Sequence, residues 1–321
     1  MKVKNGYFLF INDGTRSGMG ECSFIEGLSP DDLLNYQSTL HSACQSVQSA
    51  GFESLPDLKL FPSILFGLET AKLDLETGGQ KILFKSEFTT GEKQIPINGL
   101  VWMAKKDIML QQVKQKLAEG FNCIKIKVGA IDFEEEVTLL RYIREKFAQE
   151  VIEIRLDANG AFTYQDVLQK LETLSRFHIH SIEQPIRHGQ IEFMKSVCLS
   201  SPIPIALDEE LIGVYGSVQE DILDMIKPAY LILKPSLLGG FEACNEWIKK
   251  AEARNIKWWA TSALESNIGL NAIAQWVFTK GSPLVQGLGT GSLYVNNINS
   301  PLYISNGRLG YNPEIAWQEN F

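Results

Sequence analysis

The chain has 321 residues, enough for a full hydrophobic core and for one α/β barrel of about 250 residues. Its hydrophobic fraction of 45% and charged fraction of 21% are ordinary for a globular protein. A formal net charge of −8 argues against binding to nucleic acid or to an anionic membrane surface. The 5 cysteines are scattered, which indicates free thiols in a reducing compartment rather than disulfides or a zinc site. Because no signal peptide and no apolar run long enough to span a bilayer is found, we expect a cytoplasmic protein.

The first third of the chain predicts a small α+β unit. Strands are expected at 7–12 and 18–23, joined by an Asp-Gly turn. Ser29 and the Pro30 that follows it predict the start of a helix, because serine caps helices and proline suits the first turn. A second helix is expected at 62–75, where apolar residues recur at helical spacing.

From about residue 94 onward, short apolar runs alternate with amphipathic segments. Strands are predicted at 96–102, 123–128, 152–157, 179–183, 203–207, 229–234, 256–261 and 284–288. Helices are predicted at 105–119, 133–148, 164–176, 190–199, 217–226, 240–254 and 265–279. This alternation is typical of a (β/α)7β barrel, a modified TIM barrel with parallel strands. An open doubly wound sheet would favour a glycine-rich turn after its first strand, and residues 103–106 (MAKK) contain no glycine.

These patterns predict an α/β protein with two domains. Residues 1–93 would form an α+β capping domain, and residues 94–292 would form the barrel. The tail, from about 293 to 321, has turn signals and aromatic residues but little helical period. We expect this tail to pack back on the capping domain and complete it.

Charged residues stand at the ends of five consecutive barrel strands. They are Lys125 and Lys127, then Asp157, Glu183, Asp208 and Lys234. The last four follow one another by 26, 25 and 26 positions, which is one strand-plus-helix unit each time. Because the C-terminal ends of barrel strands converge on one face, these side chains are predicted to meet there. One charge at a strand end is usually solvated, but five in succession would be costly to bury without a function.

The residue types indicate a particular chemistry. Three carboxylates without histidine or cysteine form an oxygen-only site, which suits Mg²⁺, with Mn²⁺ as an alternative. Removing a proton next to a carboxylate adds a second negative charge, which a bound Mg²⁺ stabilises as a Lewis acid. A lysine base must be neutral, and Lys125 beside Lys127 supplies a positive neighbour that lowers the pKa. Residues two apart on a strand face the same side, so both lysines are predicted to point into the barrel.

At this point the sequence resembles the enolase superfamily and, within it, the group related to muconate lactonizing enzyme. The matching segments are 125–127 (KIK), 156–159 (LDAN), 182–185 (IEQP), 207–209 (LDE) and 233–235 (LKP), with 18–22 (GMGEC) and 27–29 (GLS) nearer the N-terminus. The resemblance implies that Asp157, Glu183 and Asp208 bind Mg²⁺. It implies that Lys127 is the acid/base, that Lys125 touches the substrate carboxylate, and that Lys234 stands on the opposite face of the substrate.

Two further segments, 261–269 (TSALESNIG) and 287–291 (GLGTG), are similar to the o-succinylbenzoate synthases of menaquinone biosynthesis. This resemblance implies a hydro-lyase, a carbon–oxygen lyase that dehydrates 2-succinyl-6-hydroxy-2,4-cyclohexadiene-1-carboxylate to 2-succinylbenzoate. It also implies substrate contacts from Asn159, Ser262, Ala263, Glu265 and Gly289. The expected partner is therefore a small carboxylate, not nucleic acid or a membrane.

Several alternatives stay open. An N-succinylamino acid racemase would use Lys127 and Lys234 as two bases on opposite faces of the substrate. Dipeptide epimerases typically carry Asp-x-Asp at the last strand, and 287–291 contains no acid. A non-catalytic barrel would be expected to lose a site carboxylate or Lys127, and none is lost. Family members usually begin with an additional strand and a mobile loop that closes over the substrate, whereas here the second strand is predicted to start at Tyr7. We therefore expect either a chain that is shortened at its N-terminus or a lid that is built differently.

Overall fold

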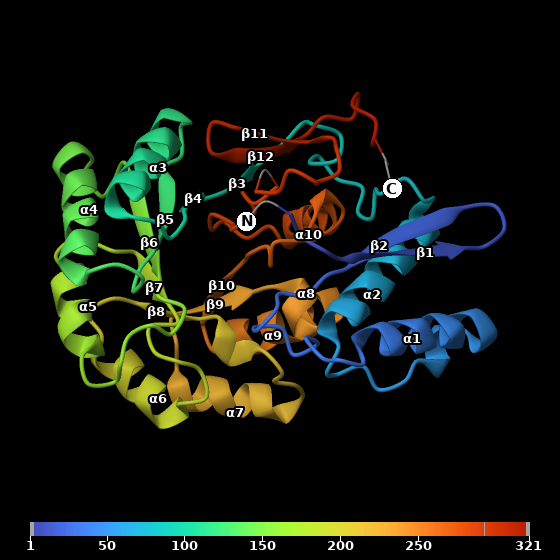
Figure 1. Cartoon of the computed structure of the whole chain (residues 1–321), viewed down its shortest axis with the longest axis horizontal. Coiled ribbons are helices and arrows are strands. Elements are labelled where there is room, and N and C mark those ends of the chain that lie inside the picture. Colours follow the sequence, from blue (N-terminus) through green and yellow to red (C-terminus); the bar gives the residue numbers. More distant parts are fainter. Residues whose placement is uncertain (1–2, 292, 319–321) are drawn as a thin grey trace.

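The computed structural model describes residues 3–291 and 293–318. The elements that precede the barrel are β1 (Tyr7–Asn12), β2 (Ser17–Cys22), α1 (Tyr36–Ala50), the 3-10 helix η1 (Phe52–Ser54), α2 (Pro62–Thr77) and β3 (Ile95–Pro96). Strands β1 and β2 form an antiparallel pair, as the sequence predicts. In Figure 1, β1, β2, α1 and α2 lie in blue on one side of the molecule, whereas β3 lies beside β4 of the curled sheet.

A curled sheet of parallel strands forms the larger part of the chain. Its strands are β4 (Gly99–Val101), β5 (Cys123–Lys127), β6 (Glu153–Asp157), β7 (Ser181–Glu183), β8 (Ile205–Leu207), β9 (Tyr230–Leu233) and β10 (Lys257–Ala260). Its helices are α3 (Lys106–Ala118), α4 (Phe133–Lys146), α5 (Val167–Ser175), α6 (Ile191–Ser200), η2 (Glu209–Leu211), α7 (Ser217–Ile226), α8 (Pro235–Leu238), α9 (Gly240–Glu252) and α10 (Asn267–Lys280). Each strand from β4 to β10 pairs with the next in chain order, which confirms the predicted barrel class.

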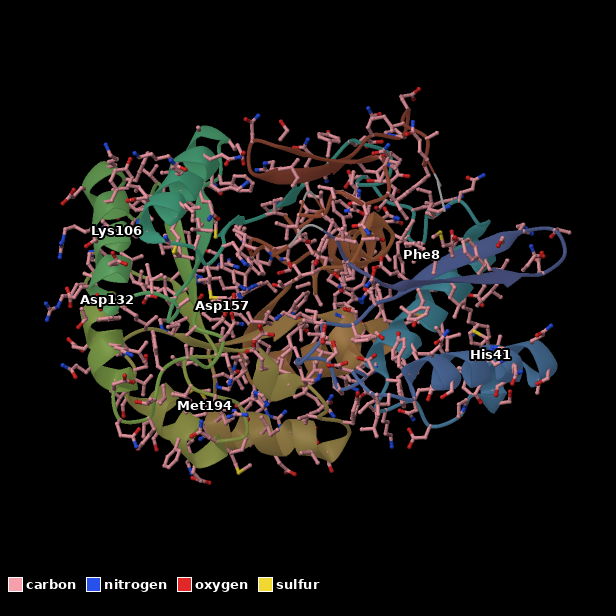
Figure 2. The ribbon with its side chains drawn as sticks, viewed as in Figure 1. Phe8, His41, Lys106, Asp132, Asp157 and Met194 are labelled. Atoms are coloured by element: carbon pink, nitrogen blue, oxygen red, sulfur yellow. The ribbon has the colours of Figure 1, made fainter. Side chains whose placement is uncertain are left out.

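The alternation of side chains along the strands explains the two environments of the sheet. On β5, Ile124 and Ile126 pack in the apolar core between strands and helices. Lys125 and Lys127 alternate with them and approach Asp157 of β6 inside the barrel. Figure 2 shows Asp157 inside the ring of helices, whereas Lys106 and Asp132 lie on the outer helices.

The eighth predicted strand, 284–288, is replaced by two short contacts that close the sheet. Gln286 bridges Ile97 and Gly287 bridges Thr261, both in parallel. The side chain of Gln286 accepts the N–H of Ala260 at 2.8 Å, which replaces a backbone bond of the ladder. A Cβ at Gly287 would lie 2.4 Å from the Thr261 hydroxyl, so this approach requires glycine.

The predicted first barrel strand, 96–102, is divided in two. Its second half is β4 and pairs with β5, but β3 pairs with a hairpin in the C-terminal tail. The hairpin consists of β11 (Leu302–Ser305) and β12 (Arg308–Tyr311), elements that the sequence does not reveal. The backbone between β3 and β4 bonds to Gly307 on one side and to Gln286 on the other, so it belongs to neither strand.

The tail contacts both parts of the molecule. Leu309 and Tyr311 of β12 belong to the large core around the barrel. Ile298 and Trp317 instead pack with Met19 of β2. Figure 1 shows the red hairpin beside β3 and above α10, at the edge of the barrel.

A second apolar cluster lies between β1, β2, α1 and α2. It contains Leu9, Cys22, Tyr36, Leu40, Ala43, Leu58, Phe61, Ile64, Leu68 and Ala71. Strand β2 packs directly on α2 because it carries glycines: a Cβ at Gly20 would lie 1.9 Å from the carbonyl oxygen of Gly67.

The predicted helix start at Ser29 is wrong, since α1 begins at Tyr36. The Ser29 hydroxyl instead accepts the N–H of Ile25, four residues earlier. Asp31 accepts the N–H of Ser63 at 2.8 Å and therefore caps α2. Both polar groups are used by contacts that local sequence does not indicate.

Among the helices that the structure describes, none is long and apolar enough to cross a membrane.

Candidate active site

Three buried carboxylates meet at the C-terminal ends of neighbouring strands. Asp157 ends β6, Glu183 ends β7 and Asp208 directly follows β8. One oxygen of each lies within 4.8 Å of the others, and no other group of three or more potential ligands is found among the described residues. The regular strand-plus-helix spacing in the sequence is therefore the cause of their convergence.

Three lysines surround these carboxylates. Lys125 contacts two of them, with its Nζ 2.8 Å from Asp157 Oδ2 and in a short contact with Glu183 Oε2. Lys127 Nζ lies 2.6 Å from Asp157 Oδ2. At the other end of the group, Lys234 Nζ lies 2.5 Å from Asp208 Oδ2. Lys127 and Lys234 thus stand at opposite ends of the carboxylate group.

The charges at this site shift one another's pKa values. Burial alone would raise the pKa of Asp157, but Lys125, Lys127 and Lys234 outweigh it and hold the pKa well below its usual range. Burial lowers the pKa of Lys125, and the neighbouring carboxylates outweigh it and raise that pKa. For Glu183, burial with Asp157 and Asp208 raises the pKa to about 8 despite Lys125. Glu183 is therefore the carboxylate of the group whose negative charge is stabilised least by the surrounding protein.

An apolar cavity of about 210 Å³ opens above these groups. Its charged floor contains Lys125, Lys127, Asp157 and Lys234. Its apolar walls come from Ile25, Leu28, Leu100, Trp102, Met103, Ala263 and Leu264. Lys127 Nζ lies 5.8 Å from the centre of the Trp102 ring, so an apolar surface faces the reactive amine. Such a mixed cavity suits an organic molecule with an acidic group at one end.

Four of the five residues predicted to contact substrate line this cavity: Asn159, Ser262, Ala263 and Gly289. The fifth, Glu265, is not among the lining residues. Its carboxylate is buried and accepts hydrogen bonds from Ser262 at 2.7 Å and from Ser236. Glu265 therefore supports the wall from behind instead of facing the cavity.

Three residues beside the site adopt the left-handed backbone conformation although they are not glycine. They are Asn159, Gln184 and Leu264, with φ values of 43°, 38° and 65°. This conformation is unfavourable for a side chain such as leucine and persists only where surrounding contacts fix it. The Oδ1 atom of Asn159 accepts a hydrogen bond from Lys127 at 2.6 Å, which orients the lysine.

The sequence did not single out several residues of the site. Trp102 and Met103 directly follow β4, so their place after a barrel strand could have indicated them. Glu209 directly follows Asp208, and its Oε1 accepts the Asn159 amide at 2.8 Å. Ile25 and Leu28 lie in the loop after β2 and cover the cavity from the N-terminal part.

The residues fit a hard divalent cation. Their donors are carboxylate oxygens alone, which such ions prefer. Glu183 Oε1 is buried and has no hydrogen-bond partner among the described residues. A buried carboxylate oxygen without a partner is costly unless a cation or ligand satisfies it. The site can therefore hold a metal ion.

Comparisons with known proteins agree with this geometry. Residues 109–312 match the family described as Enolase C-terminal domain-like. The chain belongs to this family. It is 54% identical to the o-succinylbenzoate synthase of Desulfotalea psychrophila over 250 residues, which cover 78% of this chain and 68% of that protein.

Solved structures of the enolase superfamily are also similar. The crystal structure of MenC from Desulfotalea psychrophila superposes with a TM-score of 0.85 and 43% identity, and the alignment covers 96% of this chain and 94% of that one. The L-Ala-D/L-Glu epimerase of Bacillus subtilis superposes with a TM-score of 0.80 over 99% of both chains. At 18% identity, that second likeness shows the fold alone.

Proposed function

We propose that this chain is an o-succinylbenzoate synthase, which dehydrates 2-succinyl-6-hydroxy-2,4-cyclohexadiene-1-carboxylate to 2-succinylbenzoate. One observation carries the proposal: Lys127 and Lys234 stand at opposite ends of three buried carboxylates below an apolar cavity. The identity of 54% to a protein of that name gives independent support.

The proposed base is Lys127. Its amine would take the proton from the ring carbon that bears the carboxylate, and the resulting ammonium would return a proton to the departing hydroxyl. The C–H and C–O bonds break, water leaves, and the ring becomes aromatic. The hydrogen bonds of Lys127 to Asp157 and Asn159, both 2.6 Å, would hold the amine toward the floor of the cavity.

The other two lysines would act through their charge. Lys125 lies deepest and bridges Asp157 and Glu183, so it would touch the substrate carboxylate and stay protonated. Lys234 would face the ring from the other side as a fixed cation, because burial lowers its pKa but Asp208 and Glu209 outweigh burial and raise it.

The proposed metal ion is Mg²⁺, held by Asp157, Glu183 and Asp208, with Mn²⁺ as a substitute. When bound, it supplies positive charge that stabilises the negative charge developing on the carboxylate of the substrate. These three side chains are already gathered within 4.8 Å, so little rearrangement of the protein would be needed.

The proposed place of the succinyl group is the wall made by Ser262, Ala263 and Gly289. We also propose that residues 1–93, with the tail from about 293, act as a capping domain for a catalytic barrel at 94–292. Ile25 and Leu28 of the N-terminal part line the cavity, which supports these roles for the two domains. The cap would exclude water from the reacting ring.

The direct test is dehydration of the cyclohexadiene carboxylate with and without Mg²⁺. We expect turnover that requires the metal and is abolished in Lys127→Ala. Lys106→Ala is a matched control, because Lys106 begins the outer helix α3 far from the floor of the cavity (Figure 2). Absence of turnover in a protein that binds Mg²⁺ would contradict the proposal.

The second candidate is an N-succinylamino acid racemase. The position of Lys234 opposite Lys127 favours it, because a racemase needs a base on each face of the α-carbon. Exchange of the α-proton of N-succinyl amino acids in deuterium oxide would distinguish the two activities. Exchange without dehydration would favour the racemase.

A further inference from the structure

The wall of the cavity is held in place by a residue from the far N-terminus. Lys4 precedes β1, and its Nζ donates hydrogen bonds to the carbonyl oxygens of Ala263 and Leu264, at 3.2 and 2.7 Å. The backbone of Lys4 is itself held by Asn296, whose side-chain amide donates to the Lys4 carbonyl at 3.0 Å. Residues about 260 positions apart in the sequence are therefore joined directly behind the cavity.

The wall segment needs such support because its backbone is strained. Leu264 lines the cavity and has a φ of 65°, a value that leucine rarely adopts. The Ser262 hydroxyl accepts the Leu264 N–H at 2.9 Å on the barrel side. Lys4 binds the two carbonyl oxygens, and Lys4 is not among the residues that line the cavity. The carbonyl oxygens thus face the back of the wall, and the side chains face the substrate space.

A second N-terminal residue fixes the next part of the same segment. Glu21 of β2 accepts hydrogen bonds from the N–H groups of Ser266 at 2.8 Å and Gly269 at 2.9 Å. It therefore anchors the start of α10, directly after the wall. Leu264 therefore lies between Ser262, which binds its N–H, and the anchored start of α10. Lys4 is the residue that binds the carbonyl oxygen of Leu264 itself.

We infer that Lys4 is a positioning residue for substrate recognition, which holds Ala263 and Leu264 in the conformation that shapes the wall of the cavity. The identity of the substrate in this inference rests on the proposed function, whereas the fixing of Ala263 and Leu264 by Lys4 does not depend on it. Lys4 does not touch the carboxylates or Lys127, so its loss affects binding of the substrate and leaves proton transfer intact.

The inference extends to selectivity. Because Lys4 holds both carbonyl oxygens toward the back of the wall, they are turned away from a substrate ammonium group in the cavity. A substrate with a neutral or anionic tail is thereby favoured over a dipeptide. Release of the wall would weaken this discrimination.

The test uses Lys4→Met, which keeps the apolar part of the side chain and removes the donor. Lys4→Arg retains a donor, and Lys59→Met, an exposed lysine of the same N-terminal part, is the matched control. Amide hydrogen exchange of residues 262–266 is measured in the substrate-free protein, together with KM and kcat for dehydration. We expect exchange to become roughly tenfold faster and KM to rise about fivefold in Lys4→Met, with kcat within about twofold.

Asn296→Ala provides an independent variant if Lys4→Met does not fold, and it should change exchange in the same direction by a smaller factor. Unchanged exchange at 262–266 in Lys4→Met would overturn the inference. Faster exchange throughout the protein, or a loss of kcat without a change of KM, would overturn it too. If the protein does not dehydrate the proposed substrate, the exchange measurement still decides the role of Lys4.

Discussion

The two ends of the barrel both bury charged groups, but they do so differently. At the C-terminal end, three carboxylates crowd within 4.8 Å, and Glu183 Oε1 has no partner among the described residues. Toward the N-terminal end of the same strands, Arg155 of β6 is fully buried and pairs with Glu153 at 2.7 Å. Its guanidinium also donates to the Val285 carbonyl and lies 4.1 Å from the centre of the Trp259 ring.

This difference separates a reactive site from a structural one. Arg155 has one opposite charge and an aromatic face as neighbours, and its Nη2 has no hydrogen-bond partner among the described residues, so its burial is compensated only in part. At the C-terminal end burial, with Asp157 and Asp208 close by, raises the pKa of Glu183 to about 8 despite Lys125. Like charges held together are unfavourable in the folded chain and useful only with a bound cation. Burial of charge alone therefore does not identify an active site, whereas three carboxylates gathered within 4.8 Å indicate a place for a cation.

The largest expected effect falls on activity at the C-terminal end. Lys127→Ala should lower kcat by about 10³-fold or more, since it removes the proposed acid/base. The free energy of unfolding should change by less than about 1 kcal/mol, because the variant leaves Asp157 paired with Lys125. Urea unfolding and steady-state kinetics on the same preparation would measure both. A large decrease in the free energy of unfolding would instead indicate that Lys127 has a structural role like that of Arg155.

Toward the N-terminal end of the barrel strands, a substitution should affect stability more than activity. Arg155→Met should lower the free energy of unfolding by about 3 kcal/mol, because it removes a fully buried guanidinium together with its ion pair to Glu153 and its hydrogen bond to Val285. The kcat of the remaining folded protein should stay within about twofold. Arg254→Met is the control: it breaks the ion pair with Asp224, whose side chain is 63% exposed, and should cost at most about 1 kcal/mol. Equal losses in the two variants would contradict the comparison.

The role of the three carboxylates as metal ligands can be tested by the effect of Mg²⁺ on thermal stability. Saturating Mg²⁺ should raise the melting temperature of the natural protein by about 3 °C or more. In Glu183→Gln this rise should disappear, while the metal-free protein melts at the same temperature or higher, because one like charge is removed. Differential scanning calorimetry at fixed Mg²⁺ concentrations would show both effects. A metal-dependent rise that survives in the variant would exclude Glu183 as a ligand.

The convergence of the charged residues could be predicted because it depends on local rules. The period of two along β5 predicts that Lys125 and Lys127 share a face, and both in fact contact Asp157. The strand-plus-helix spacing predicts that Asp157, Glu183 and Asp208 reach one end of the barrel. These rules need no knowledge of which distant segments meet.

The remaining features depend on contacts between distant segments. Ile25 and Leu28 cover the cavity, and Lys4 fixes Leu264, only because the N-terminal part folds against the barrel. Glu265 was predicted to face the substrate, but hydrogen bonds from Ser262 and Ser236 draw its carboxylate behind the wall. No local sequence pattern predicts these contacts between distant segments.

The smallest expected effect concerns Glu69, a half-buried carboxylate outside the barrel. Glu69 of α2 accepts hydrogen bonds from the N–H groups of Phe241 and Glu242 at the start of α9. Burial outweighs these bonds and raises its pKa to about 7. Glu69 has no cluster of carboxylates around it, so its effect should appear in stability and not in metal binding.

Because the pKa of Glu69 is higher in the folded protein than in the unfolded chain, folding takes up a proton between about pH 4.5 and pH 7. The free energy of unfolding therefore falls as the pH rises through this range, by roughly 1 to 2 kcal/mol for this partly exposed group. Glu69→Gln should remove that part of the pH dependence and leave the Mg²⁺ response unchanged. Urea unfolding at pH 5 and pH 8 would measure the change in the free energy of unfolding between the two pH values. If this change is the same in Glu69→Gln and in the natural protein, Glu69 is already charged at pH 5.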